Sequence, residues 1–70
     1  MKRTNILKKL GDKVRTYREA AGLSQEALGN QTELGRTYIS GVERGVRNPS
    51  IVSLEKIARA LGVTLSQLVE

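Results

Sequence analysis

The stretch that most constrains this chain runs from Ser24 to Asn48 and reads SQEALGNQTELGRTYISGVERGVRN. It predicts two short helices joined by a tight turn. Ser24 can cap the first helix, at about 25–31, because a serine hydroxyl accepts a hydrogen bond from a free amide at a helix start. Leu28 gives this helix an inward anchor, and a break follows at 31–35. The stretch therefore predicts a compact helical pair.

The second helix of this pair has one apolar side, because Ile39 and Val42 lie three residues apart. Its other side is small, polar and basic. A helix with no large apolar residue on its outward side and a guanidinium near each end is suited to enter a groove lined with hydrogen-bond acceptors. The outward residues are Arg36, Thr37, Ser40, Gly41 and Arg44.

Three blocks of the sequence resemble the lambda-repressor/Cro-type (Xre-type) helix-turn-helix family. They read LGDKVRTYREAAGLSQEAL, RTYISGVERGVRNPS and LEKIARALGV, and they stand in the order and spacing of the family. The resemblance covers the chain from about Leu10 to Val69. The segment RTYISGVERG followed by RN is most similar to the small controller proteins of restriction–modification systems.

Two positions depart from the family pattern. Gly29 stands where a small alanine is usual, and Glu33 stands in the turn where glycine is usual. If Glu33 adopts a positive φ, this costs about 1 kcal/mol without excluding the turn.

The rest of the chain predicts three further helices, and so an all-α, five-helix single domain over 1–70. A first helix at 5–21 is expected from apolar residues at steps of three and four, and Gly22 is placed to end it. Ser50 can cap a helix that Gly62 ends, and Thr64 with Gln67 reads as a capping box for a short helix at 65–69. The expected apolar stripes are Leu7, Leu10, Val14, Tyr17 and Ala21, and then Ile51, Leu54, Ile57, Ala58 and Leu61.

The charge distribution favours a polyanionic partner. The net charge is +5, and residues 1–18 contain seven basic groups against one acidic group. Such segregation of positive charge suits a polyanion that approaches the protein from one side. Residues 1–4 would then form a basic N-terminal arm. A solvated basic tail is the alternative for Lys2, Arg3, Lys8 and Lys9.

The DNA-contacting residues are expected on the helical pair and on the loop after it. Arg36 is the first side chain past the helix start, where a guanidinium can donate two hydrogen bonds to guanine. The resemblance implies that the start of the first motif helix and the loop after the second bind phosphates. The expected base contacts are Arg36, Thr37, Ser40 and Gly41, and the expected phosphate contacts are Ser24, Gln25, Tyr38, Arg44, Arg47 and Asn48.

The resemblance implies a structural role for one arginine. Residues that match Arg18 and Glu43 pair inside the fold of the family. The alternative is that Arg18 is exposed and binds a phosphate.

The end of the chain, residues 63–70, has more apolar side chains than one short helix can bury. The resemblance implies a two-fold dimer through this region, and the alternative is that these residues complete the small core. The candidate interface residues are Val63, Leu65, Leu68 and Val69.

These observations predict a cytoplasmic, dimeric, sequence-specific regulator of transcription that binds double-stranded DNA. Repression would follow from occupying a promoter, and activation from touching RNA polymerase. The alternative is a helical protein-interaction module that reads no bases. An enzyme is not expected, because the chain has no His, no Cys and no converging pair of acids. Neither a metal, a cofactor, a signal peptide nor a membrane span is indicated.

Overall fold

The computed structural model describes residues 3–70, with side chains from Ile6 onward. Within this range the chain forms five α-helices and no strand, which confirms the predicted all-α fold. The predicted arm at 1–4 is wrong for Arg3 and Thr4, because both belong to the first helix; residues 1 and 2 lie outside the described part. The helices are α1 (Arg3–Ala20), α2 (Gln25–Thr32), α3 (Arg36–Glu43), α4 (Ile51–Leu61) and α5 (Leu65–Val69).

Side-chain capping interactions set the starts of α2, α4 and α5. The Ser24 hydroxyl accepts from the amide of Ala27 at 3.0 Å, and the Ser50 hydroxyl accepts from the amide of Ser53 at 3.1 Å. Each bond satisfies one of the amides that a helix start leaves free. The capping box at the start of α5 is also present, since the Gln67 amide donates to the Thr64 hydroxyl and the Gln67 side chain accepts from the Thr64 amide.

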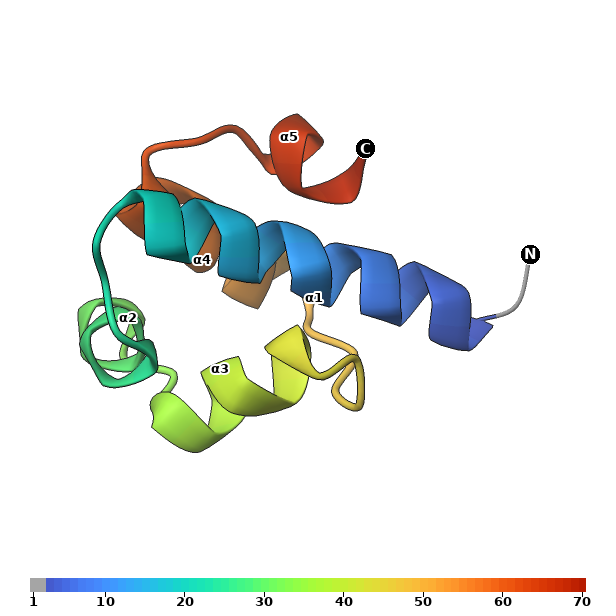
Figure 1. Cartoon of the computed structure of the whole chain (residues 1–70), viewed down its shortest axis with the longest axis horizontal. Coiled ribbons are helices and arrows are strands. Elements are labelled where there is room, and N and C mark those ends of the chain that lie inside the picture. Colours follow the sequence, from blue (N-terminus) through green and yellow to red (C-terminus); the bar gives the residue numbers. More distant parts are fainter. Residues whose placement is uncertain (1–2) are drawn as a thin grey trace.

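Helix α1 crosses the molecule and the other four helices pack around it (Figure 1). Helices α2 and α3 lie on one side of α1, α5 lies on the opposite side, and α4 lies behind. Helix α1 contacts α3, α4 and α5, while α2 contacts α3 and α4. The largest fully buried side chains come from all five helices: Leu28, Ile39, Ile57, Leu68, Val14 and Val42.

Two residues of the predicted stripes lie outside the core. Ile51 is 64% exposed, because burial of α4 begins one turn later at Leu54. Ala21 follows the last residue of α1 and is exposed. The predicted stripes are therefore wrong at these two ends.

In residues 3–70, no helix combines the length and the apolar character needed to cross a membrane.

Candidate nucleic-acid interface

The turn between α2 and α3 is held by its backbone. Glu33 adopts the left-handed conformation, with φ 63° and ψ 11°. This is the positive φ that was considered for this residue from the sequence. The amide of Gly35 donates to the Gly29 carbonyl at 3.1 Å. A Cβ at Gly29 would lie 2.6 Å from the Gly35 carbonyl carbon and 2.7 Å from the Arg36 nitrogen. Glycine is therefore required at position 29 for α2 to come this close to the start of α3.

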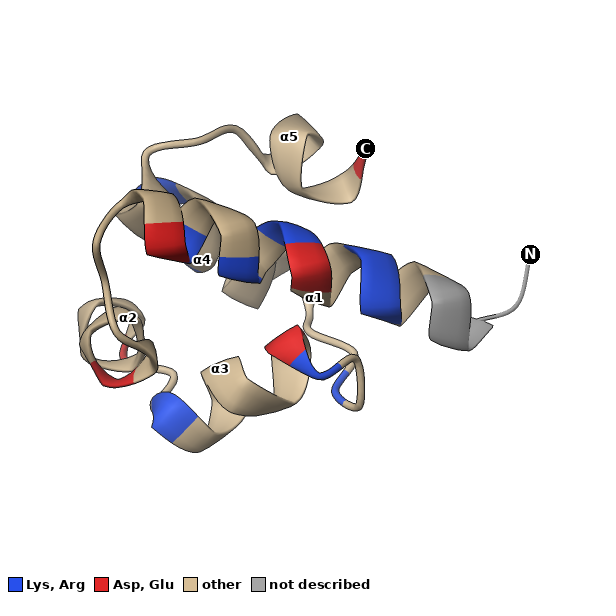
Figure 2. Cartoon of the chain, in the orientation of Figure 1, with Lys and Arg blue, Asp and Glu red and all other residues tan. Residues whose placement is uncertain are grey.

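Helix α3 buries one side and exposes the other. Ile39 and Val42 are both 0% exposed, whereas Arg36 and Thr37 lie on the surface. Ser40 is partly buried, and its hydroxyl accepts from Arg44 Nε at 3.3 Å. Figure 2 shows basic residues at the start of α3 and just past its end.

Gly41 does not face outward with these residues. It is buried, and a Cβ at this position would lie 3.3 Å from Cβ of Arg47. Its carbonyl accepts from the amides of Val46 and Arg47, at 3.0 and 3.2 Å. Gly41 therefore lies against the loop that follows α3, and the prediction that it opens space for base edges is wrong.

That loop contains three of the expected phosphate contacts, Arg44, Arg47 and Asn48, which are all exposed. Arg47 lies over the aromatic ring of Tyr38, with 4.7 Å between its guanidinium carbon and the ring centroid. The ring is partly buried against the core. Tyr38 and Arg47 thus place a positive charge beside α3.

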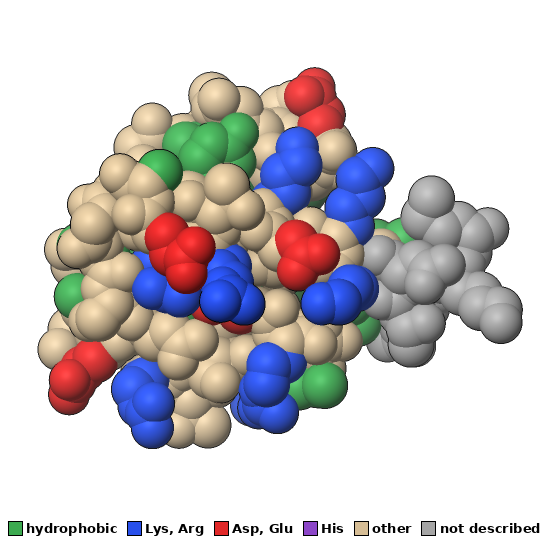
Figure 3. Space-filling view, viewed as in Figure 1, with side chains coloured by type: hydrophobic (Ala, Val, Ile, Leu, Met, Phe, Trp, Pro, Cys, Tyr) green, Lys and Arg blue, Asp and Glu red, His purple; other side chains and the backbone are tan. Residues whose placement is uncertain are grey.

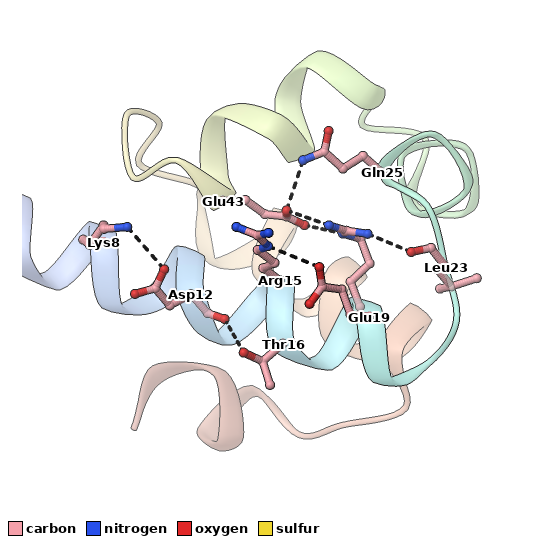
Figure 4. Close-up of polar contacts among 9 residues, drawn as sticks. Lys8, Asp12, Arg15, Thr16, Glu19, Leu23, Gln25 and Glu43 are labelled. Carbon is pink, nitrogen blue, oxygen red and sulfur yellow. Dashed lines mark hydrogen bonds and ion pairs between the residues drawn. The ribbon is translucent and has the colours of Figure 1, made fainter.

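The start of α2 is tied to the end of α3 and to α1 through Glu43, whose side chain is 4% exposed (Figure 4). Arg18 Nε donates to Glu43 Oε2 at 2.6 Å and Arg18 Nη2 to Glu43 Oε1 at 3.1 Å, while Arg18 Nη1 donates to the Leu23 carbonyl at 2.8 Å. Hydrogen bonding to this carboxylate raises the pKa of Arg18. Gln25 Nε2 also donates to Glu43 Oε1, at 3.1 Å. The structure thus brings Arg18 and Glu43 together as a pair inside the fold.

The arginines near α3 differ in their pairing from Lys8 and Arg15, two of the basic residues of α1. Figure 3 shows Lys and Arg side chains across this face, with acidic side chains among them. On α1, Lys8 pairs with Asp12 at 3.4 Å and Arg15 pairs with Glu19 at 3.3 Å. Among the described residues, no carboxylate lies within ion-pair distance of the three arginines at α3 and its loop: Arg36, Arg44 and Arg47.

The expected interface residues at the C-terminus occupy different environments. Leu68 is 1% exposed and belongs to the core of the single chain, so its assignment as a main interface residue is wrong. Val63 and Leu65 are partly buried against that core. Val69 alone of the four is widely exposed, at 59%.

A model of a helix-turn-helix family matches residues 14–68, which contain α2, α3 and α4, the C-terminal part of α1 and all of α5 except its last residue. This chain belongs to the Xre-type helix-turn-helix family. The relatives of this Xre-type protein include the control protein C.MunI of Mycoplasma sp, which is 49% identical over 61 residues, covering 86% of this chain and 82% of the relative.

Solved structures agree with this assignment. The restriction–modification controller protein C.AhdI from Aeromonas hydrophila superposes with a TM-score of 0.86 at 47% identity, covering 89% of this chain and 94% of that one. The biofilm regulator SinR, solved in complex with DNA, superposes with a TM-score of 0.83 at 32% identity over 87% and 98% of the two chains. SinR of Bacillus subtilis is also among the sequence relatives. These proteins are regulators or controllers by name, and none is described as an enzyme.

Two contacts of this Xre-type protein were not anticipated from its sequence: Gln25 with Glu43, and Tyr38 with Arg47. The first joins residues 18 positions apart, and no local pattern signals such a contact. For the second, an aromatic residue near an arginine-containing loop was a visible but weak signal.

Proposed function

We propose that this protein is a sequence-specific DNA-binding regulator of transcription, and that it acts as a controller of a restriction–modification system. The observation that supports DNA binding best is the group of three arginines at α3 and its loop, Arg36, Arg44 and Arg47, which lack carboxylate partners among the described residues. Cations left without partners on one surface are suited to neutralise phosphates. The similarity to C.MunI and C.AhdI supports the controller role.

In this proposal the start of α3 enters the major groove. Arg36 donates two hydrogen bonds to O6 and N7 of a guanine, and Thr37 contacts a thymine methyl group or a phosphate. Ser40 lies about one turn further along the same helix, where its hydroxyl can donate while Arg44 holds its oxygen. These three residues are the proposed base contacts.

The DNA backbone is bound on both sides of α3. The first amides of α2 have no acceptor within the helix, so the Ser24–Gln25 segment presents donors to a phosphate at the positive end of the helix dipole. Gln25 Nε2 has a second hydrogen besides the one donated to Glu43. The remaining proposed phosphate contacts are Arg44, Arg47 and Asn48.

The regulator acts as a homodimer on a two-fold symmetric operator, with half-sites about 34 Å apart. Bound protein would repress by covering a promoter or activate by contacting RNA polymerase. Its place of action is the cytoplasm, where the DNA it regulates is found.

The test begins by selecting bound sequences from a random duplex library, which should yield one symmetric site. Arg36→Ala should then weaken binding to that site by about 1–3 kcal/mol and flatten the preference at one base pair per half-site. Affinity for random duplex should stay nearly unchanged, because binding to random DNA comes from phosphate contacts. Arg59→Ala is the matched control, since Arg59 lies on α4 near Glu55 and should alter neither affinity.

A selection that recovers no consensus would contradict sequence-specific binding. An equal loss of affinity for operator and random DNA in Arg36→Ala would make Arg36 a phosphate contact and not a base reader.

A further inference from the structure

We propose that Tyr38 is a positioning residue for Arg47: its ring holds the loop guanidinium beside α3 so that it meets a DNA phosphate. The inference rests on the proposed function, because it assigns a mechanism to one part of the same surface. It differs from a direct contact of the Tyr38 hydroxyl with DNA, because here the ring holds the Arg47 guanidinium and the hydroxyl has no part.

The first observation is the position of the Arg47 guanidinium over the Tyr38 ring. The guanidinium carbon of Arg47 lies 4.7 Å from the centroid of the Tyr38 ring. A cation within about 6 Å of an aromatic face is attracted by the negative charge of that face. The ring is itself anchored, because Tyr38 packs against the hydrophobic core. It therefore gives a fixed surface to a side chain that would otherwise be free to rotate.

The second observation is the fit of the loop backbone on α3. The Gly41 carbonyl accepts from the amides of Val46 and Arg47, at 3.0 and 3.2 Å. Cβ of Arg47 lies 3.3 Å from the place where a Cβ at Gly41 would be, so the absent side chain lets the loop lie against the helix. Tyr38 and Gly41 are three residues apart and so lie on the same side of α3. Together they form the seat of Arg47.

The third observation is that this seat leaves Arg47 free to bind an anion. Arg47 is exposed, and among the described residues no carboxylate pairs with it. A guanidinium above a ring has five N–H groups and can still direct some of them away from the ring. Because the Arg47 side chain is already held in place before binding, it loses less conformational entropy on contact with DNA than a flexible arginine would.

The experiment is a double-mutant cycle on random duplex DNA at constant salt. Arg47→Ala should weaken binding and lower the slope of log K against log salt by about one unit per subunit. Tyr38→Leu keeps an apolar contact with the core but removes the ring, and it should weaken binding about two- to fivefold per subunit. In the Arg47→Ala background the same Tyr38→Leu change should cause no further loss, and Tyr38→Phe in the parent should bind like the parent.

An independent measurement needs no DNA. Ring current from Tyr38 should move the NMR signals of the Arg47 side chain upfield in the free parent and in Tyr38→Phe, but not in Tyr38→Leu. Equal loss from Tyr38→Leu in both backgrounds, or a Tyr38→Phe protein as weak as Tyr38→Leu, would overturn the positioning role. A parent that binds no duplex at all would instead overturn the proposed function.

Discussion

Glu43 is the side chain on which the geometry of the binding surface depends most. It accepts hydrogen bonds from Arg18 of α1 and from Gln25 at the start of α2, while it belongs to the last turn of α3. The Arg18 and Glu43 side chains are only 11% and 4% exposed. A buried carboxylate with this many donors fixes how three helices meet, because each lost bond would leave a polar group without a partner.

Glu43→Ala should therefore lower the free energy of unfolding by about 3 kcal/mol or more, because it leaves the Arg18 charge buried and unpaired. Urea or thermal unfolding measures this. Glu55→Ala is the matched control: it removes a carboxylate from an exposed pair with Arg59 and should cost less than about 1 kcal/mol. A Glu43→Ala protein as stable as the Glu55→Ala control would contradict the structural role of the pair.

At the scale of an element, the turn between α2 and α3 combines close packing with backbone strain. Gly29 lets the two helices approach, and Glu33 ends α2 in the left-handed conformation with its amide donating to the Asn30 carbonyl. A residue with a Cβ is strained in this conformation, whereas glycine is not. The turn thus forms with one residue that is not optimal for it.

Glu33→Gly should stabilise the protein by about 0.5–1 kcal/mol, since relief of the strain exceeds the added flexibility of the unfolded chain. Thermal unfolding reports the change. The same substitution at Glu26, in the regular first turn of α2, should destabilise by about 1 kcal/mol. If both variants were destabilised to the same extent, φ 63° at Glu33 would carry no measurable cost.

At the scale of the whole molecule, a groove suggests where a second copy packs. Its volume is ≈ 410 Å³, and it lies where α1, α4 and α5 meet. Ile6 and Val69 line it and are 53% and 59% exposed. The other lining residues are less exposed leucines and two polar residues: Leu7, Leu10, Leu54, Leu68, Lys9 and Asn48. Wide exposure of apolar side chains beside such a groove favours burial by a partner surface. We place the proposed two-fold interface here, with the exposed Val69, and not the buried Leu68, as its main contact.

Val69→Asp should weaken self-association at least about tenfold, because it puts a charge into the buried part of the interface. Stability of the monomer should change by less than about 0.5 kcal/mol, since Val69 is exposed in the single chain. Sedimentation equilibrium over a concentration series measures the first effect and thermal unfolding the second.

The control for this substitution is Ala20→Asp, which adds the same charge at the exposed end of α1 and should leave association unchanged. Unaltered association in Val69→Asp would move the interface away from this groove.

The helices and their limits were determined by the sequence to within one or two residues. The reason is that caps, helix-ending glycines and apolar stripes act over about four residues, so they can be read along the chain. The Arg18–Glu43 pair, 25 positions apart, was anticipated only through resemblance to a family. The exposed positions of Arg36 and Thr37 followed from the opposite, buried positions of Ile39 and Val42.

The packing of the helices decided what each side chain contacts. Local periodicity predicted Ile51 in the core, but Ile51 is exposed and the burial of α4 begins at Leu54. Leu68 was assigned to an interface, but α5 folds back on α1 and α4 and buries it. Gly41 lies under the loop, and Gln25 is held by a carboxylate 18 residues away. Such contacts join segments distant in the chain, and only the tertiary structure brings those segments together.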